Sequence, residues 1–235
     1  MTTHYRRRHH QLIASCLENF NTDYLARHNI LFGGGTRIAL ELDEYRESVD
    51  IDFLCPDINA YRAVRQQVTN TSLGELVRLP FNYSREIRFD RYGVRTFINA
   101  AGVNIKLEFV AFDHYQLSAT LGEQLFPVPY IDQTSCFITK LLANADRVAL
   151  KPYKDIFDLV VMFSHWGHIP ETAFAEAYRH YSQSVVQQGL TRALQHWFVN
   201  ETDYASAAKD MAIEPAYYSN VILPAARRLA QSGEC

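Results

Sequence analysis

The chain has 235 residues, of which 48% are hydrophobic and 21% charged, a composition typical of a folded protein with a substantial core. Its formal net charge of −3 excludes a uniformly basic nucleic-acid-binding protein, and its apolar runs are too short to span a bilayer. The basic start lacks a long apolar segment, and the four cysteines lack metal or redox spacing. We therefore expect a reduced, cytoplasmic protein without a membrane partner.

The first predicted element is an amphipathic helix over residues 5–27, which contain no glycine or proline and carry apolar residues at helical spacing. Its start holds the densest basic run of the chain, Arg6-Arg7-Arg8-His9-His10. Such a run either binds nucleic acid locally or forms a solvated first helical turn. The sequence leaves both interpretations open.

Three glycines interrupt the chain in the stretch FGGGT, residues 32–36. Residues 30–32 resemble a short buried strand, Thr36 is a suitable N-cap, and residues 37–45 are strong helix formers. A glycine turn between a strand and a helix directs backbone N–H groups and the positive end of the helix dipole at one point, which suits a phosphate. The stretch has neither the lysine of a P-loop nor the third glycine of a dinucleotide fingerprint, which excludes both. A simple flexible turn remains the alternative.

Two aspartates follow in SVDIDFL, residues 48–54, whose alternation predicts a β-strand. The apolar residues fall on one face of this strand, and Asp50 and Asp52 fall on the other, about 7 Å apart. Two neighbouring carboxylates raise each other's pKa when buried, but they become favourable around a divalent cation such as Mg²⁺. We therefore predict a metal site here rather than a solvated strand edge.

A helix is expected from Tyr61, and three alternating segments separated by Gly93 and Gly102 predict a β-meander over residues 86–112. In the last segment Glu108 lies on the polar face of an otherwise apolar strand. A third carboxylate on a neighbouring strand would complete a two-metal site, which makes Glu108 a candidate ligand. A solvated edge residue is an equally simple interpretation of Glu108.

From residue 131 the pattern becomes helical, with almost no strand signal. We therefore predict an α+β protein, with a mixed sheet and flanking helices in residues 1–130 and a helical domain packed against it in residues 131–235. His165 and His168 have a spacing that a metal could use, but Gly167 and Pro170 indicate that the helix ends there. A capping or packing role is favoured for both histidines.

The combination of Gly35-Thr36, thirteen further residues and Asp50-Ile51-Asp52 resembles the signature of the DNA polymerase beta-like nucleotidyltransferase superfamily. Residues 32–54 are more closely similar to nucleotidyltransferase toxins of the AbiEii/AbiGii type, which pair a GGT-A-L motif with R-S-DIDF. A lysine on a later helix and a K-D-x-x-D-L pattern fit the same family, here Lys140 and Lys154, Asp155, Asp158 and Leu159. The resemblance covers about residues 30–163, and residues 164–235 carry no further motif.

The resemblance implies a nucleotide site and a metal site. The backbone and hydroxyl groups that would hold the triphosphate belong to Gly34, Gly35 and Thr36, and the further nucleotide contacts would come from Arg46, Ser48, Lys140 and Lys154. Asp50 and Asp52 would bind the metal, with Glu108 as a third ligand or as the base for an attacking hydroxyl.

The remaining charged residues have supporting roles in this scheme. Lys140 would neutralise the leaving pyrophosphate, and Asp155 would act as a catalytic residue that orients Lys140 or contacts the base or the acceptor. An ordinary salt bridge between helices is an equal alternative for the Lys154 and Asp155 pair, and Asp158 is interpreted as structural. Two departures from the family pattern remain, because Glu108 replaces an aspartate and Lys151 or Arg147 replaces an arginine found at another offset.

By resemblance, the protein would be a nucleotidyltransferase that depends on Mg²⁺, with Mn²⁺ as an alternative, and moves a nucleoside monophosphate from an NTP to a hydroxyl. It would be the toxin of a bacterial toxin–antitoxin or abortive-infection system, with a partner antitoxin and with RNA, such as a tRNA 3′ end, or a protein as acceptor. One alternative is a catalytically degenerate protein that only binds a nucleotide or a partner. Another is a phosphohydrolase with an Asp-x-Asp nucleophile, which would leave the later Lys-Asp motif unexplained.

Overall fold

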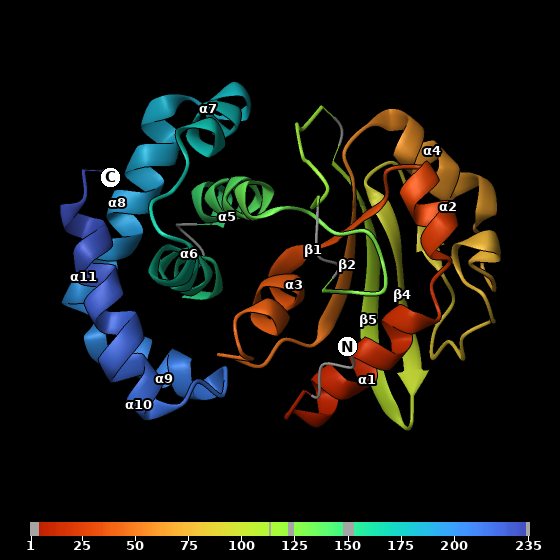
Figure 1. Cartoon of the computed structure of the whole chain (residues 1–235), viewed down its shortest axis with the longest axis horizontal. Coiled ribbons are helices and arrows are strands. Elements are labelled where there is room, and N and C mark those ends of the chain that lie inside the picture. Colours follow the sequence, from red (N-terminus) through yellow and green to blue (C-terminus); the bar gives the residue numbers. More distant parts are fainter. Residues whose placement is uncertain (1–4, 113, 122–124, 148–152, 234–235) are drawn as a thin grey trace. The chain divides into compact units, whose positions relative to one another are not determined.

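The computed structural model describes residues 5–112, 114–121, 125–147 and 153–233. The chain forms two compact units, which are coloured along the sequence in Figure 1. The first, the sheet unit, comprises Met1–Glu44 and Ser48–Asp132. The second, the helical unit, comprises Gln133–Cys235 together with the three-residue segment Tyr45–Glu47.

The sheet unit contains a five-stranded sheet in the order β1-β2-β5-β4-β3. The strands are β1 (Leu31–Gly33), β2 (Asp50–Cys55), β3 (Arg88–Phe89), β4 (Gly93–Ala100) and β5 (Val103–Ala111). The two central strands β2 and β5 pair in parallel, and the other neighbours pair antiparallel. The predicted α+β class with a mixed sheet is confirmed.

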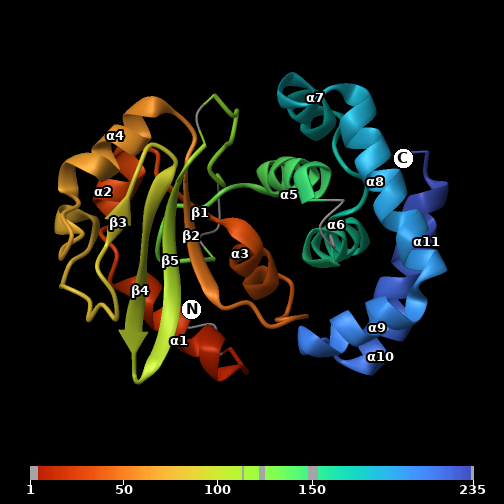
Figure 2. The ribbon, with the colours of Figure 1, turned by 180° about the vertical axis from the view of Figure 1, so that it is seen from behind.

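Helices α1 (Arg8–Glu18), α2 (Thr22–Arg27) and α4 (Ile58–Gln67) lie on one face of this sheet, as both views show (Figures 1 and 2). They cover the apolar side chains of β2 and β5, among them Phe53 and Phe109, whose rings stack 5.1 Å apart. Full burial of each such side chain contributes about 1.5–3 kcal/mol. Since the apolar face is covered in this way, the polar side chains of β2 and β5 occupy the opposite face.

The helix predicted over residues 5–27 is two helices rather than one. The chain leaves α1 after Glu18, and the Asn21 side chain then accepts a hydrogen bond from the Tyr24 N–H and caps α2. Asparagine is a strong N-cap because its short side chain reaches the unpaired N–H groups of a first turn. The apolar spacing alone does not show such a break.

Helix α3 (Gly34–Glu41) differs from its prediction at both ends. It begins at Gly34 with Gly33 as its N-cap, so the expectation that Thr36 is the N-cap was wrong, and Thr36 lies in the first turn. It ends at Glu41 because Asp43 and Glu44 have positive φ angles of 54°. Residue 45 is therefore not helical, and the segment Tyr45–Glu47 belongs to the helical unit.

The predicted meander is present, although β3 has only two residues. The Asp90 carboxylate accepts hydrogen bonds from the Tyr92 and Gly93 N–H groups and so closes a tight turn directly after β3. A short 3₁₀ turn at Gly74–Leu76 follows α4.

The helical unit contains α5 (Gln133–Arg147), α6 (Tyr153–Trp166), α7 (Glu171–His180), α8 (Gln183–Val199), α9 (Glu201–Asp210), α10 (Pro215–Tyr217), a π-helical turn (Tyr218–Ile222) and α11 (Leu223–Gln231). Its core includes Phe157, Trp197 and Tyr204, with ring centroids of the last two 4.8 Å apart. The helical second half is confirmed. Within the described ranges, no helix is both long and apolar enough to cross a membrane.

The segment that contains His165 and His168 ends a helix, as predicted. Helix α6 stops at Trp166, and Gly167 has a φ of 90°. The His165 ring lies 2.6 Å from the Tyr217 hydroxyl, and the His168 ring packs edge-on against Phe163. Both histidines thus have packing or hydrogen-bonding roles within the helical unit.

Candidate active site

The carboxylates predicted to bind metal lie together on the polar face of the sheet. Asp50 and Asp52 are half-buried on β2, opposite in direction to the buried Ile51 and Phe53. In the parallel pairing of β2 with β5, Lys106 lies beside Asp50, and Glu108 lies beside Asp52. Adjacent strands are about 4.8 Å apart, so this register brings the three acidic side chains into one neighbourhood.

Glu108 is already bound by two cations on that face. Its Oε1 accepts from Arg95 Nε at 3.0 Å, and its Oε2 lies 2.5 Å from Lys106 Nζ. Over the ranges that the structure describes, no group of three histidine, cysteine or acidic side chains is arranged to hold a metal. The role of Glu108 as a third ligand therefore stays a prediction, and it requires Glu108 to exchange one of these cations for the metal.

Lys106 is a member of this cluster that the sequence analysis did not select. Burial lowers the pKa of Lys106, but the hydrogen bond and charge of Glu108 and the charges of Asp50 and Asp52 outweigh it and raise the pKa above its usual value. Lys106 thus stays protonated and offsets the mutual repulsion of the three carboxylates. Lys106 alternates with the apolar residues of β5 as Glu108 does, so the alternation alone indicates its place on the polar face. Arg95 was not detectable in this way, because its position beside Glu108 depends on the pairing register of β4.

The glycine turn meets this carboxylate cluster at Gly34, the first residue of α3. Gly34 has a φ of 70°, a left-handed conformation that favours glycine. A Cβ atom at this position would lie 2.2 Å from Asp52 Oδ2, so only a residue without a side chain allows the carboxylate this close. The first turn of a helix leaves N–H groups without intrahelical acceptors and carries a partial positive charge. The N-terminus of α3 and the Asp52 carboxylate therefore lie side by side.

Thr36 and Ser48, both predicted to bind the nucleotide, are buried and contact each other. The Thr36 hydroxyl lies 2.8 Å from the Ser48 hydroxyl and donates to the Asp50 carbonyl at 2.5 Å. These contacts fix the start of β2 to the first turn of α3. They give both hydroxyl groups internal partners, which leaves the backbone N–H groups of the turn as the better candidates for phosphate contacts.

A second charged cluster lies in the helical unit around Asp158, which is fully buried on α6. Arg46 binds the Asp158 carboxylate through Nε at 2.8 Å and Nη2 at 3.1 Å, and the Tyr45 hydroxyl donates to it as well. Burial alone would raise the pKa of Asp158, but the charges and hydrogen bonds of Arg46 and Lys140 hold it well below the usual range. Asp158 is the centre of an ionic network, in agreement with its predicted structural role.

Lys140 on α5 belongs to the same cluster and is 7% exposed. Its Nζ lies 2.6 Å from Asp158 and 3.1 Å from Asp155, which itself binds Arg147 at 2.7 Å. Burial lowers the pKa of Lys140, but the charges of Asp158 and Asp155 outweigh it and raise the pKa, so the side chain is a cation. Asp155 is thus in contact with Lys140, and this contact is also a salt bridge between two helices.

The other predicted residues of this group are less closely involved. Arg147, one of two replacements considered for the missing arginine, contacts Asp155, whereas Lys151 lies outside the described residues. Lys154 is exposed on α6. The guanidinium of Arg46, predicted to bind nucleotide, is 2% exposed and is occupied by Asp158, Tyr45 and the Glu47 carbonyl.

The predicted residues therefore form two groups, one in each unit. The sheet unit holds Gly34, Gly35, Thr36, Ser48, Asp50, Asp52 and Glu108, and the helical unit holds Arg46, Lys140, Lys154 and Asp155. In the first group, the two aspartates offer the oxygen ligands that Mg²⁺ prefers, next to a helix N-terminus suited to phosphate. These residues fit a metal-bound triphosphate.

Among curated proteins, none matches the chain. A solved candidate nucleotidyltransferase from H. pylori aligns over 95% of this chain and 90% of its own length, with 16% identity and a TM-score of 0.48. The solved JHP933 from Helicobacter pylori aligns over 86% of this chain and 96% of its own, with 15% identity and a TM-score of 0.35.

The model of one protein family covers nearly the whole sequence. It matches residues 16–230 and is described as the nucleotidyl transferase AbiEii toxin of a type IV toxin–antitoxin system. This match extends the resemblance beyond residues 30–163 in both directions and includes the C-terminal helices that carried no motif. The chain belongs to the AbiEii family of nucleotidyl transferase toxins.

Proposed function

We propose that this toxin-family enzyme transfers a nucleoside monophosphate from an NTP to a hydroxyl group with Mg²⁺, for which Mn²⁺ can substitute. The observation that carries the proposal is the contact between the glycine turn and the aspartate strand. Because Gly34 has no side chain, the N-terminus of α3 lies directly against the Asp52 carboxylate. A site for an anion and a site for a cation are thereby adjacent, as a metal-bound triphosphate requires.

Each group in the sheet unit has a distinct part in this reaction. Asp50 and Asp52 would hold the metal, which supplies polarisation of the phosphoryl oxygens and a more acidic acceptor hydroxyl when bound. The N–H groups of Gly34, Gly35 and Thr36 would hold the triphosphate. The acceptor oxygen then bonds to the α-phosphorus, the bond from that phosphorus to the bridging oxygen breaks, and pyrophosphate leaves. The hydroxyl proton passes to a base, for which Glu108 is the candidate.

Lys140 would stabilise the negative charge that develops on the leaving pyrophosphate. Its contacts with Asp158 and Asp155 keep it protonated and fixed in place. We assign Arg46 to this support, because its guanidinium binds Asp158, and we assign the exposed Lys154 to contact with the nucleotide or the acceptor.

The family match supports a role in a toxin–antitoxin system, and the finer assignments are part of the proposal. We propose that the protein acts in the bacterial cytoplasm, that its acceptor is RNA such as tRNA or a protein, and that a partner antitoxin counteracts it.

The test is incubation with each α-labelled NTP, Mg²⁺ and total bacterial RNA. The variant Asp52→Asn removes one charge with almost no change in shape. Asp57→Asn is the matched control, because Asp57 caps α4 through the Asn59 and Ala60 N–H groups and asparagine caps equally well. We expect label in RNA with the wild type and Asp57→Asn, and at least about a hundredfold less with Asp52→Asn.

Other outcomes have defined meanings. Label in the protein itself or in an added protein would identify a protein acceptor. Tight NTP binding with no labelled product on any acceptor would contradict the proposed reaction and favour a catalytically degenerate binding protein. The salt bridges of Glu108 with Arg95 and Lys106 would then be permanent and would keep Glu108 from acting as a base. Equal labelling by Asp52→Asn would remove Asp52 from the site.

A further inference from the structure

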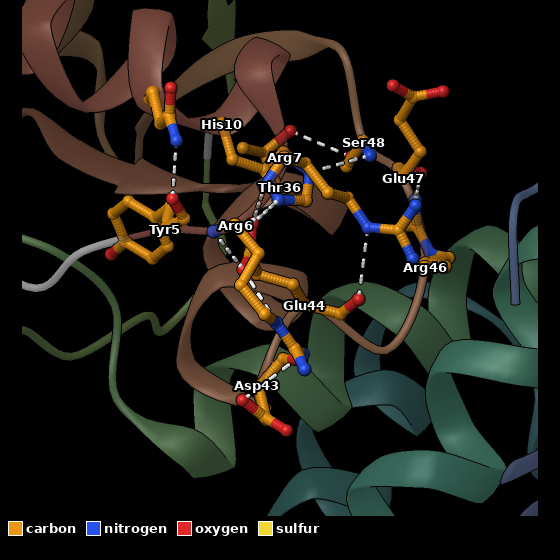
Figure 3. Close-up of polar contacts among 11 residues, drawn as sticks. Tyr5, Arg6, Arg7, His10, Thr36, Asp43, Glu44, Arg46, Glu47 and Ser48 are labelled. Atoms are coloured by element: carbon orange, nitrogen blue, oxygen red, sulfur yellow. Dashed lines mark hydrogen bonds and ion pairs between the residues drawn. The ribbon is translucent and has the colours of Figure 1, made fainter. Parts of the chain in front are cut away.

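The Glu44 side chain collects four hydrogen-bond donors from the N-terminal segment, as Figure 3 shows. Its carboxylate accepts from the Arg6 N–H at 2.6 Å, Arg6 Nε at 3.3 Å, the Arg7 N–H at 3.0 Å and His10 Nδ1 at 2.8 Å. Glu44 is only 4% exposed. Arg7 is the N-cap residue of α1 and His10 lies in its first turn, so Glu44 is hydrogen-bonded both to the backbone just before the helix and to a side chain of its first turn.

This contact stabilises an unfavourable backbone turn. Asp43 and Glu44 both have a φ of 54°, a left-handed conformation that is unfavourable for residues other than glycine. Such a turn persists only where its surroundings hold it. The hydrogen bonds of Glu44 with Arg6, Arg7 and His10 stabilise this turn.

His10 links Glu44 to the strand that carries the aspartates. It is fully buried, and its Nε2 lies 3.0 Å from the Ser48 backbone nitrogen. A backbone N–H can only donate, so Nε2 is the acceptor and carries no proton. The ring proton is then on Nδ1 and is donated to Glu44, which fixes both the tautomer and the orientation of the ring.

The contacts continue from Ser48 to the start of β2. The Ser48 hydroxyl contacts the Thr36 hydroxyl, which donates to the Asp50 carbonyl. Figure 3 shows His10, Ser48 and Thr36 grouped together. One continuous series of hydrogen bonds therefore joins α1, the turn after α3, the first turn of α3 and the first residue of β2.

We propose that His10 is a positioning residue: its Nε2, oriented by Glu44, accepts the Ser48 N–H and so acts through Ser48 and Thr36 to hold the Asp50 and Asp52 strand against the N-terminus of α3. The importance of this hold for catalysis rests on the proposed function. The basic run at residues 6–10 thus has a third role that the sequence did not indicate: it docks the N-terminal helix onto the site. Neither a local nucleic-acid patch nor a solvated turn explains a fully buried His10.

Two substitutions test the two hydrogen bonds of the His10 ring separately. His10→Asn keeps an amide nitrogen where Nδ1 meets Glu44 but removes the acceptor for the Ser48 N–H. His10→Gln places its amide oxygen where Nε2 lies and keeps that acceptor, while it loses the donor to Glu44. Both remove a buried ring and one hydrogen bond, so a merely structural role predicts similar behaviour of the two variants.

The experiment measures hydrogen exchange of the peptide that spans residues 48–52, together with Mn²⁺ affinity and the kcat and KM of transfer. We expect His10→Asn to exchange about tenfold faster in this peptide and to lower kcat by about tenfold or more, with a smaller change in KM, since one buried hydrogen bond is lost. His10→Gln should remain within about threefold of the wild type. Equal exchange and equal kcat in the two variants would overturn the proposal.

A measurement on the unaltered protein covers the case in which neither variant folds. Long-range ¹H–¹⁵N NMR of the histidine rings should show His10 as the Nδ1–H tautomer with an unprotonated Nε2, and a slowly exchanging Ser48 N–H. An Nε2–H tautomer would overturn the proposal. If the wild type transfers no nucleotide at all, the proposed function fails, while the exchange, the Mn²⁺ affinity and the tautomer still decide whether His10 positions this strand.

Discussion

At the scale of the residue, Gly34 decides how close an anion site and a cation site can be. Glycine is required here for two separate reasons. Gly34 has a φ of 70°, which is unfavourable for other residues, and a Cβ at this position would lie only 2.2 Å from Asp52 Oδ2. A substitution here changes both the backbone conformation and the position of the carboxylate. The adjacent Gly33 has an extended backbone, which any residue can adopt. Glycine is required there for packing, since a Cβ would lie 2.8 Å from the Leu54 side chain.

We predict that Gly34→Ala lowers transfer by about a hundredfold or more, because the methyl group must displace the Asp52 carboxylate. The matched control is Gly102→Ala in the turn between β4 and β5. Gly102 has a φ of 82°, but a Cβ there meets nothing within 4 Å. Both variants should lose about 1–2 kcal/mol of stability in urea, since both force alanine into a left-handed conformation, yet Gly102→Ala should keep its activity. Equal activity of the two variants would contradict this assignment.

The sequence was informative about single residues wherever an alternating pattern decided their direction. Asp50 and Asp52 share a face with Lys106 and Glu108, and alternation indicates each of these directions. The partners of Glu108 were not predictable, because Arg95 reaches it only through the register between β4 and β5. The burial of His10 was not predictable either, since its partner Glu44 lies 34 residues further along the chain.

At the scale of the element, the ionic network around Asp158 joins α5, α6 and the segment Tyr45–Glu47 within the helical unit. Arg46, Lys140, Asp155 and Asp158 are four buried charged groups in contact. Removing the Asp158 charge leaves Arg46 and Lys140 buried with Asp155 as the remaining carboxylate of the cluster.

We predict that Asp158→Asn costs about 3–5 kcal/mol of unfolding free energy at pH 7. The folded pKa of Asp158 is lowered, so its stabilisation is fully present above the unfolded pKa of about 3.9 and is lost as the pH falls below that value toward the folded pKa. The difference in unfolding free energy between wild type and Asp158→Asn, measured in urea, should therefore be constant above the unfolded pKa of about 3.9 and narrow progressively as the pH falls below it. Asp43→Asn, at an exposed salt bridge with Arg6, should change stability by less than about 1 kcal/mol. A pH-independent difference would contradict the account.

Helices α5 and α8 pack closely against each other at Gly189. A Cβ on Gly189 of α8 would lie 3.2 Å from the backbone Cα of Ala145 on α5, so the two helices approach closely. We predict that Gly189→Val destabilises the protein by about 2 kcal/mol or more, because the added methyl groups overlap a backbone that cannot move aside. Thermal unfolding monitored by circular dichroism measures this effect. Unchanged or raised stability would show that the crossing can widen.

Predictions for the elements were best where a long period was uninterrupted and worst at their ends. The long apolar period of α5 and α6 and the alternation of β4 and β5 were sufficient to identify them. The break between α1 and α2 and the early start of α3 were missed, since caps and tertiary contacts decide helix ends more than propensity does. The left-handed turn at Asp43 and Glu44 that ends α3 is such a case, because it depends on hydrogen bonds from the N–H groups of Arg6 and Arg7 to Glu44.

At the scale of the whole molecule, the family match places both units in one enzyme. Residues 45–47 illustrate how the two parts of the chain are interwoven in sequence, since this segment lies between α3 and β2 and yet belongs to the helical unit. The hydrophobic pattern of the sequence does not indicate that this segment belongs to the helical unit, because three residues are too few to show a period.

We predict that induced expression of the chain in a bacterial host arrests growth, as the toxin family implies. Asp52→Asn should abolish the arrest at equal protein levels, and Asp57→Asn should preserve it, because only the former alters the proposed metal site. Growth curves with immunoblots for protein level measure this outcome. Growth arrest by Asp52→Asn as strong as that by the wild type would separate toxicity from nucleotide transfer.

The central claim is that the aspartates of β2, held against the glycine turn, perform nucleotide transfer with loss of pyrophosphate. The most direct test is the stoichiometry of pyrophosphate and of transferred nucleotide, measured in the same reaction for the wild type and Asp52→Asn with Mg²⁺ and after its removal with EDTA. We predict one pyrophosphate for each nucleotide transferred by the wild type, and neither product with the variant or after chelation. Release of inorganic phosphate without pyrophosphate would contradict the claim and identify a phosphohydrolase instead.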